Sequence, residues 1–346
     1  MADITTNWVT FLASNDRRGG TSAVRTSGLK ELIWKVTLPE SVRSSPVLRD
    51  GVLYITCRNG ILYALDSRTG KERWTYQAAD ALRSTPSLSG NLVLFGSDDG
   101  SVYAVDRTAG RLSWKSGIGG QVWTSPVVLG DAVFSGSTNG AFVSMERGTG
   151  KVRWKRDFDG QILSTAYATE KMVYFGCGNG KLYALDPATG KDAWTHDTDD
   201  GIASAPVVID NVVVIGSEDY TVRAVDAASG RLRWKFETEY GIQSTPAASA
   251  GKVFIGGKDG FFYALNLADG KVAWKSKPMR TLTAAPVAAE GSVWIQGFYG
   301  ATQSFDINTG EEQSRMSLGG SLQSTPIVTG EAVYLATYPG VVYAVR

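Results

Sequence analysis

Short apolar runs follow one another along the chain, and turn residues interrupt them every six to eight positions. In the unit that we take as the type, the runs 45–48, 52–57 and 61–66 are rich in β-branched and aliphatic residues, and a fourth run begins at 71–74. Runs of this length predict β-strands, and the Asn-Gly pair at 59–60 predicts a tight hairpin. Helical repeats need amphipathic stretches of ten or more residues, so the pattern excludes an all-helical array.

The unit repeats every 40 residues without insertion or deletion, and three residue types mark its register. The first marker is tryptophan, at Trp34, Trp74, Trp114, Trp154, Trp194, Trp234 and Trp274. The second is proline, with Ala166 in the one missing place, at Pro46, Pro86, Pro126, Pro206, Pro246, Pro286 and Pro326. The third is glycine, at Gly70, Gly110, Gly150, Gly190, Gly230, Gly270 and Gly310. Eight four-stranded units of about 40 residues predict an all-β, eight-bladed propeller with antiparallel blades.

The eighth unit lacks a fourth strand of its own, because the sequence ends at Arg346. The segment 29–36 has the fourth-strand pattern, with Trp34 in register, but it precedes the first complete unit. We expect this segment to pair with the C-terminal hairpin and close the ring, which removes an open sheet edge.

The ring accounts for nearly all of the 346 residues, so we expect one propeller domain over 29–346. Residues 1–28 are expected to form an N-terminal arm that is ordered only around Trp8 and Phe11. The beginning of the chain has no secretory-signal pattern, and it is equally consistent with a segment cut from a longer protein.

The charges nearly cancel, with 35 basic and 34 acidic residues and a net charge of +1. Such a balance gives no overall attraction to a phosphate backbone, so we expect no nucleic-acid partner. No apolar run approaches the roughly 20 residues that cross a bilayer, so we expect no transmembrane segment. We expect a monomer.

The repeat carries the eleven-residue pattern A-x-D-x-x-x-G-x-x-x-W, as in 64–74. Further full copies begin at Ala104, Ala184 and Ala224, and near copies begin at Ser144 and Ala264. The pattern resembles the tryptophan-docking motif of pyrroloquinoline quinone (PQQ)-type propellers, and the resemblance spans 29–346. It implies that the seven tryptophans are structural, each burying roughly 150–250 Å² at a gain of at most ~4–6 kcal/mol.

The resemblance also implies a function class. Dehydrogenases of this family are similar in fold but much longer, and they carry an adjacent cysteine pair near the quinone. Here Cys57 and Cys177 stand three periods apart, and we expect two inert buried thiols. Members without a cofactor include the outer-membrane-protein assembly lipoprotein and the sensor propellers of bacterial serine/threonine kinases. The resemblance therefore implies a non-enzymatic scaffold or sensor domain without a cofactor, in the periplasm or outside the cell. The alternative is a PQQ-type oxidoreductase, or another enzyme that uses the channel-mouth rim.

Catalytic and metal-binding motifs are scarce. The only histidine, His196, is expected in a solvated loop, so neither a histidine-rich metal cluster nor a Ser-His-Asp arrangement can form. The acidic turns 98–100 and 218–219 offer fewer oxygens than a calcium loop collects, and we interpret them as hairpin chemistry. We expect no catalytic residue and no metal site.

Positions that differ between blades are better candidates for function than positions that repeat. One such column enters each inner strand, at Arg43, Arg83, Trp123, Leu163, Ala203, Gln243, Thr283 and Gln323. A second lies in the hairpin between strands two and three, at Arg58, Asp98, Thr138, Gly178, Glu218, Lys258, Phe298 and Tyr338. We expect both columns on one face, around the mouth of the central channel, and we call them the rim.

Two groups of rim residues are the candidates for binding. Guanidinium groups of Arg43, Arg58 and Arg83, with the indole of Trp123 one blade further, can receive an anionic or aromatic group of a small ligand, protein or peptide. Alternatively, the arginines pair with local carboxylates such as Glu40 and Asp80, and the indole only plugs the channel. The remaining candidates are Gln243, Lys258, Phe298, Tyr299, Gln323 and Tyr338.

Blade seven departs most from the repeat, with Phe298-Tyr299 in its hairpin, Gln303 for the common tyrosine and Ser314 for the tryptophan. It is either degenerate or specialised, and its aromatic residues form a contact patch with Tyr338 or pack among loops. The same face is electrically divided, which favours an oriented protein or peptide partner unless these are only solvated loop charges. Its acidic residues are Asp157, Asp159, Asp197, Asp199, Asp200, Glu237 and Glu239, and its basic residues are Lys275, Lys277 and Arg280.

Overall fold

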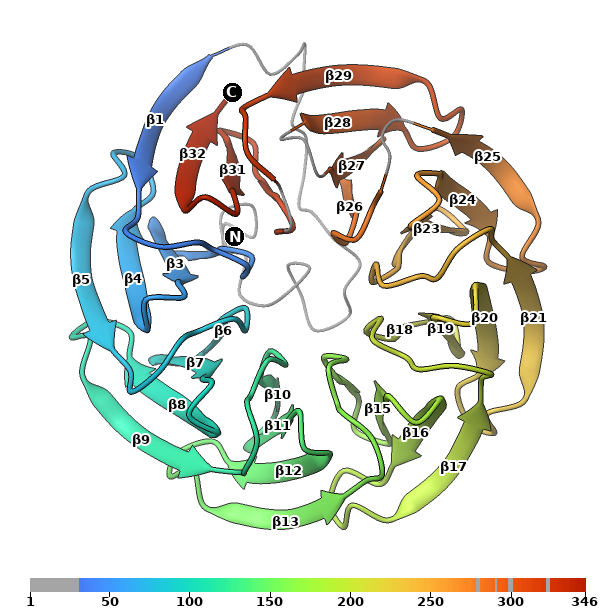
Figure 1. The fold of residues 1–346 in the computed structure, drawn as a ribbon, viewed down its shortest axis with the longest axis horizontal. Coiled ribbons are helices and arrows are strands. Elements are labelled where there is room, and N and C mark those ends of the chain that lie inside the picture. Colours follow the sequence, from blue (N-terminus) through green and yellow to red (C-terminus); the bar gives the residue numbers. More distant parts are fainter. Residues whose placement is uncertain (1–30, 278–280, 290, 298–300, 322–323) are drawn as a thin grey trace, which may run out of the picture.

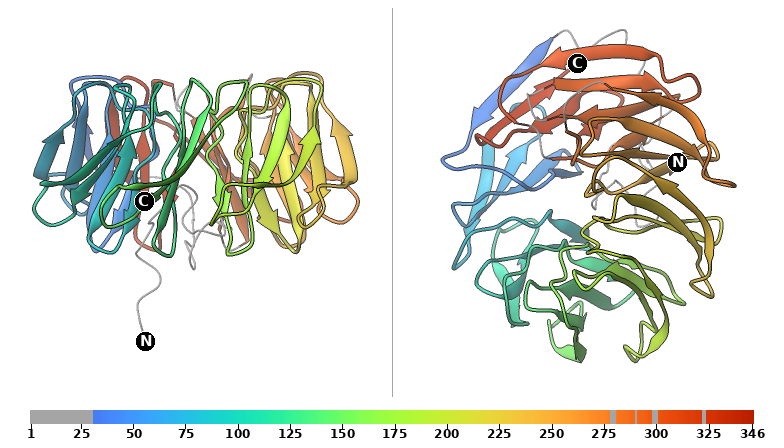
Figure 2. Two further views of the ribbon diagram at one scale, coloured as in Figure 1. Left: turned by 90° about the horizontal axis from the view of Figure 1, so that it is seen from below. Right: turned by 45° about the vertical axis from the view of Figure 1, so that its right-hand side comes forward.

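The computed structural model describes residues 31–277, 281–289, 291–297, 301–321 and 324–346. Within these ranges the chain forms strands and turns and no helix. The strands make eight separate four-stranded antiparallel sheets, which stand as blades around a central axis (Figure 1). Seen from the edge, the ring is a wide, short cylinder (Figure 2). The predicted eight-bladed propeller is therefore confirmed.

Four strands make up each blade, numbered outwards from the axis. Blade 1 contains β2 (Val47–Arg49), β3 (Val52–Thr56), β4 (Ile61–Asp66) and β5 (Glu72–Gln77). Blade 2 contains β6 (Ser87–Ser89), β7 (Leu92–Gly96), β8 (Ser101–Asp106) and β9 (Leu112–Gly117). Blade 3 contains β10 (Val127–Leu129), β11 (Ala132–Gly136), β12 (Ala141–Glu146) and β13 (Val152–Asp157). Blade 4 contains β14 (Tyr167–Ala168), β15 (Val173–Gly176), β16 (Lys181–Leu185) and β17 (Asp192–Asp197).

The second half of the chain repeats this order. Blade 5 contains β18 (Val207–Ile209), β19 (Val212–Gly216), β20 (Thr221–Asp226) and β21 (Leu232–Glu237). Blade 6 contains β22 (Ala247–Ser249), β23 (Lys252–Gly256), β24 (Phe262–Asn266) and β25 (Val272–Ser276). Blade 7 contains β26 (Val287–Ala289), β27 (Ser292–Gln296), β28 (Ala301–Asp306) and β29 (Glu312–Ser317). Blade 8 contains β30 (Ile327–Val328), β31 (Val333–Ala336), β32 (Val341–Val345) and β1 (Leu32–Thr37).

The hydrophobic core lies between neighbouring blades. The two middle strands of each blade are largely buried on both faces, because each face packs against another sheet. In one such layer, Tyr54 and Leu62 of blade 1 pack with Phe95 and Tyr103 of blade 2. The outer strands alternate exposed and half-buried positions instead, which is the pattern of a strand with one solvated face.

The ring closes through β1, which pairs antiparallel with β32 from Leu32 opposite Val345 to Thr37 opposite Val341. Just before it, the backbone of Glu31 exchanges hydrogen bonds of 2.8 and 2.9 Å with Arg346. The predicted closure is confirmed, with the strand beginning at Leu32 instead of residue 29. The arm 1–28, with Trp8 and Phe11, lies outside the described residues.

The tryptophans connect each outer strand to the next blade. Trp154 in β13 donates its indole N–H to Pro187 O in blade 4, at 3.0 Å. The same indole covers Gly190, where an added Cβ would come within 2.8 Å of the ring and the φ angle is +70°. Glycine is required there both by the close approach and by the backbone conformation. The same indole-to-carbonyl bond, 33 residues along the chain, is made by Trp34, Trp74, Trp114, Trp194, Trp234 and Trp274.

The boundary between blades 7 and 8 lacks this contact, because Ser314 replaces the tryptophan. In the other seven boundaries the acceptor carbonyl belongs to the turn that joins the third and fourth strands of the next blade. Blade 8 has no such turn, since its fourth strand is β1 from the other part of the chain. Among the described residues no turn of this kind offers an equivalent carbonyl to position 314, and the Ser314 hydroxyl bonds that of Ser304 at 2.7 Å.

Candidate functional site

The described residues of both rim columns lie on one face of the ring. In blade 2, Asp98 N–H donates to Ala81 O, which places the hairpin against the segment that leads to Arg83. The equivalent bond recurs in other blades, for example from Arg58 to Ser41 and from Tyr338 to Ser321. The hairpin residue of one blade consequently touches the strand-entry residues of its own blade and the next.

The most enclosed group on the rim is formed by Arg83, Asp98 and Trp123. Arg83 Nε lies 2.8 Å from Asp98 Oδ2, and the Trp123 indole N–H donates to Asp98 Oδ1 at 2.9 Å. The guanidinium also stacks on the indole, 4.7 Å from the ring centroid. The Asp98 side chain is only 4% exposed, so this ion pair is shielded from water. Arg83 and Trp123 are brought together as the sequence suggested, but they bind each other through Asp98.

The alternative interpretation, in which rim arginines pair with local carboxylates, describes Arg83, but its partner is Asp98 and not Glu40 or Asp80. Asp80 was an expected partner for an arginine, yet it accepts the N–H of Ala81 instead. Glu40 likewise accepts the N–H of Ser41, and this bond, more than the charge of Arg58, lowers the pKa of Glu40. The actual carboxylate partner, Asp98, follows Arg83 by 15 positions and reaches it only through the hairpin.

A second closed group joins blades 5 and 6. Glu218 accepts hydrogen bonds from Gln243 at 2.6 Å and from Lys258 at 2.8 and 3.0 Å. As in the first group, an acidic hairpin residue satisfies the strand-entry residue of the next blade. Two of the candidate binding residues therefore hold a carboxylate of their own chain.

The boundary between blades 8 and 1 is different. Arg43 is exposed and lies over the Tyr338 ring, 5.5 Å from its centroid. Arg58 is half-buried in the neighbouring hairpin. Within the part of the chain that the structure describes, neither guanidinium forms a direct ion pair with a carboxylate, although the charge of Arg58 acts on Glu40. We call Arg43, Arg58 and Tyr338 the arginine sector.

Some of the candidate residues lie outside the described residues. They are Phe298, Tyr299 and Gln323 of the rim candidates and Arg280 of the basic group. Tyr338 is half-buried, and its described ring contact is with Arg43.

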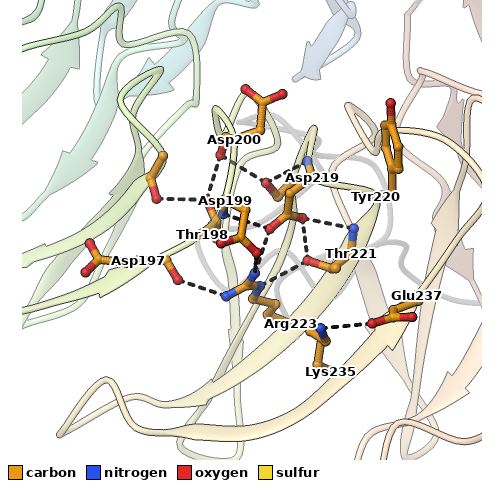
Figure 3. Close-up of polar contacts among 12 residues, drawn as sticks. Asp197, Thr198, Asp199, Asp200, Asp219, Tyr220, Thr221, Arg223, Lys235 and Glu237 are labelled. Carbon is orange, nitrogen blue, oxygen red and sulfur yellow. Dashed lines mark hydrogen bonds and ion pairs between the residues drawn. The ribbon is translucent and has the colours of Figure 1, made fainter.

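The acidic half of the face is built around a residue that sequence reasoning missed, Arg223. It replaces the tyrosine found at the equivalent positions 63, 103, 183 and 263. Its guanidinium, with the side chain 10% exposed, bonds Asp219 at 2.6 Å and Asp199 at 3.3 Å (Figure 3). The departure from the tyrosine column was the signal that would have identified it.

In each acidic turn the second residue, Asp99 or Asp219, bonds its own hairpin as interpreted from the sequence. The first residue, Asp98 or Glu218, bonds rim side chains instead. Asp99 accepts hydrogen bonds from Ser101 and Tyr103 and pairs with Lys115 at 2.8 Å. Burial raises the pKa of Asp99, but the bonds from Lys115 and Tyr103 outweigh it and hold that pKa below the ordinary value. Within the described ranges no three histidine, cysteine or acidic side chains converge as metal ligands.

His196 does not lie in a solvated loop, so that prediction is wrong. It is half-buried within β17, because this strand continues beyond Trp194 to Asp197 and so includes position 196. Its Nδ1 lies 3.1 Å from Gly230 O. Burial, followed by the charge of Arg223, lowers the pKa of His196.

Both cysteines are free and fully buried, as predicted. Burial raises the pKa of each thiol above its ordinary value, which disfavours the reactive thiolate. Cys57 Sγ donates to Glu40 O at 3.2 Å. The two thiols are thus inert parts of the interblade packing.

Comparison with known proteins agrees with the propeller fold. A family model described as outer membrane protein assembly factor BamB matches residues 98–176 and 162–346. The chain belongs to this family. BamB from Moraxella catarrhalis has a similar fold, with a TM-score of 0.80 and 19% identity over 91% of this chain and 99% of that protein. The family resemblance inferred from the repeat is thereby confirmed.

Other similar folds include enzymes and a design. Quinohemoprotein alcohol dehydrogenase from Comamonas testosteroni superimposes with a TM-score of 0.85 and 15% identity over 99% of this chain and 81% of that one. The computationally designed Ika8 protein gives a TM-score of 0.81 with 18% identity over 92% of this chain and all of that one. Identities this low show a shared fold alone.

One curated relative matches over a short segment. It is the 1-butanol dehydrogenase (cytochrome c) of Thauera butanivorans, 43% identical over 47 residues. The match spans 13% of this chain and 7% of that enzyme. This length corresponds to little more than one propeller blade.

The described residues do not fit a quinone site of the kind that the resemblance describes. The two cysteines lie in blades 1 and 4, each buried in a separate interblade layer. Asp98 and Glu218, the acidic rim residues, are held by side chains of their own chain.

None of the described residues belongs to a helix that is long and apolar enough to cross a membrane.

Proposed function

We propose that this propeller is a non-enzymatic binding or scaffold module, in the manner of an assembly factor or of the sensor portion of a larger bacterial protein. Support comes from the family, which is described as an outer membrane protein assembly factor. Further support comes from the distribution of contacts: the outer belt repeats one bond in seven boundaries, whereas the rim differs from blade to blade. A variable rim on a constant frame is suited to recognising one partner.

The arginine sector is the binding site that we favour. The observation that carries this proposal is that neither Arg43 nor Arg58 forms a described ion pair with a carboxylate, whereas Arg83 pairs with Asp98 and stacks on Trp123. A guanidinium group binds carboxylates in a bidentate manner and stacks on aromatic rings. Tyr338 already orients Arg43 through such a contact. An acidic side chain or carboxylate of a protein or peptide, or of a small anionic ligand, fits this sector.

The test uses fluorescence anisotropy with a fluorescein-labelled glutamate-rich peptide. Changing Arg43→Gln together with Arg58→Gln should weaken binding about tenfold, because two charge-assisted contacts are lost. The control changes Arg111→Gln and Arg231→Gln, two exposed arginines of the outer belt, and removes the same net charge. Equal losses in both double variants would show nonspecific attraction and would contradict the proposal.

The alternative function is a PQQ-type oxidoreductase, favoured by the short match to the 1-butanol dehydrogenase and by the fold of the quinohemoprotein enzyme. It is tested by adding PQQ and calcium while following the absorbance of the quinone and the melting temperature of the protein. A shift in either supports this alternative, and no change in both ends it.

A further inference from the structure

Tyr220 occupies a position that the repeat reserves for glycine. The equivalent residues are Gly60, Gly100, Gly140, Gly180, Gly260, Gly300 and Gly340. Tyr220 keeps the left-handed conformation of that position, with a φ angle of +70°. A bulky residue is unfavourable in this region of φ. The tyrosine therefore stands at this position at a cost in backbone strain.

Tyr240 lies beside it, in the loop that follows the outer strand of blade 5. The two ring centroids are 6.5 Å apart, and the ring planes are inclined by 58°. The Thr238 hydroxyl donates to the carbonyls of both tyrosines at 2.8 Å, which holds the hairpin and the loop together. The spacing of the two rings is thus fixed by the backbone.

Neither ring contributes to the core. Tyr220 is 53% exposed and Tyr240 is 58% exposed, and every other aromatic side chain in the described part of the chain is at least half-buried. Figure 3 shows the Tyr220 ring directed away from the hydrogen-bonded group around Arg223. Exposed tyrosines placed side by side are typical of binding hot spots, because they offer a large rigid contact area.

The charges around the pair are predominantly negative. Asp199, with its side chain 90% exposed, Asp200 and Glu239 border the two loops. The described cations near them are already engaged: Arg223 with Asp219 and Asp199, and Lys235 with Glu237 at 2.9 Å. Tyrosine faces and carboxylates both attract a cation. On the blade 6 side the acidic region ends, where Lys275 and Lys277 lie over Phe261.

We propose that Tyr220 and Tyr240 form an aromatic clamp for a basic segment of a partner polypeptide. An arginine or lysine side chain lies against the two rings, and Asp199, Asp200 and Glu239 bind the flanking positive charges. The clamp is in blade 5, across the ring from the arginine sector in blade 1 (Figure 1). It goes beyond the proposed function and does not depend on Arg43 or Arg58.

The experiment measures anisotropy of a fluorescein-labelled peptide of alternating arginine and serine. Tyr220→Gly or Tyr240→Ala should each weaken binding about threefold, and the double variant about tenfold. Tyr220→Phe should retain affinity, because the ring face is unchanged. Asp200→Asn with Glu239→Gln should weaken binding and reduce its dependence on salt.

Two controls separate the clamp from general charge and from folding. Leu112→Ala alters an exposed residue of the outer belt, and Glu72→Gln with Glu311→Gln removes two exposed carboxylates there. These variants should bind the peptide as the unaltered protein does, with unchanged melting temperatures. Loss of binding in them, or full binding by the double tyrosine variant, would overturn the proposal.

Sedimentation velocity identifies the other possible occupant. If the unaltered protein dimerises and the double tyrosine variant is monomeric, the clamp holds a second copy of this chain and the proposal is overturned. The proposal is also overturned if a peptide of alternating serine and glutamate binds as tightly as the basic peptide. Both outcomes are separate from the test of Arg43 and Arg58, which uses different variants and a peptide of opposite charge.

Discussion

Blade 3 contains two tryptophans whose indoles connect it to a neighbouring blade in different ways. Trp154 donates to a backbone carbonyl, Pro187 O, whereas Trp123 donates to a side chain, Asp98. A backbone acceptor exists whatever residue occupies the position, so the first contact recurs in seven boundaries. A carboxylate acceptor depends on one residue, so the second occurs once among the described residues. Contacts through the backbone build the frame, and contacts through side chains give the rim its individuality.

The largest effect should come from opening the frame. Deleting residues 1–36 removes most of β1 and the Trp34 bond to Ser67 O at 2.9 Å. The open edge of β32 and the exposed core of blade 8 should cost on the order of the whole free energy of unfolding, about 5–15 kcal/mol. Circular dichroism and size-exclusion chromatography should show unfolded or aggregated protein. Deleting only residues 1–28 is the control, and equal damage from it would contradict the role of β1.

The two tryptophans of blade 3 give the direct comparison. Trp154→Ala removes a packed indole and should lower the free energy of unfolding by about 3–5 kcal/mol. Trp123→Ala should cost less, about 1–3 kcal/mol, mainly by leaving Asp98 with one bond fewer. Urea unfolding measures both. The reverse change, Ser314→Trp, should not stabilise, because blade 8 has no turn to accept the indole; a gain there would show that the turn carbonyl is not the decisive partner.

A smaller effect concerns acid sensitivity. Burial holds the folded-state pKa of His196 below 6.5, so the unfolded chain takes up the proton first as the pH falls. This contribution to stability is present above pH 6.5 and is lost as the pH falls through the folded-state pKa. The equivalent position in the next blade is Phe236, so His196→Phe is a conservative change in the repeat. It should reduce the change in melting temperature between neutral and mildly acidic pH.

The carboxylates lose their contribution to stability at a lower pH than His196 does, so they serve as the control. Asp66 has a pKa of about 2, held down chiefly by the hydrogen bond from Arg73 and then by that from Thr69. Its ordinary value is 3.8, so its contribution is lost only as the pH falls from there towards 2. An unchanged slope above pH 5 in the His196→Phe protein would remove His196 as the cause.

The smallest effect should have the opposite sign. Tyr220→Gly relieves the left-handed strain of a non-glycine residue, about 1–2 kcal/mol, while glycine adds about 0.5–1 kcal/mol of unfolded-state entropy. The net result should be a gain of about 0.5–1 kcal/mol in the free energy of unfolding, measured by urea titration. A loss of stability would mean that the ring packs in the fold, against its exposure of 53%.

Much of the fold could be predicted from the sequence, because the frame repeats. The three registers gave the blade number, and the Asn-Gly turn gave the strands β3 and β4 to within one residue. The tryptophan at position 34, which is in register but precedes the first complete unit, indicated the closure. The meaning of Ser314 could not be obtained in this way, since it depends on which turn is missing from the neighbouring blade.

The rim was harder to predict. The two columns were identified correctly as neighbours, but the carboxylate that joins Arg83 to Trp123 belongs to a different blade from the indole, and proximity in sequence suggested Asp80 instead. His196 was misplaced because the outer strand continues past its tryptophan. Tyr220 was not predicted as a binding residue, because the hairpin column contains position 218 and its equivalents, whereas the glycine position lies two residues later.

The absent indole between blades 7 and 8 gives the ring a seam. Glu31 and Arg346 are already hydrogen-bonded neighbours there, so a short linker between them would restore an ordinary turn and let Ser314 become a tryptophan. New chain termini could then be placed in the turn between the third and fourth strands of any other blade. The tryptophan of the blade before it, which donates to that turn, would then become dispensable. The seam is thus set by where the polypeptide is interrupted, and it can be moved around the circle by permuting the order of the sequence.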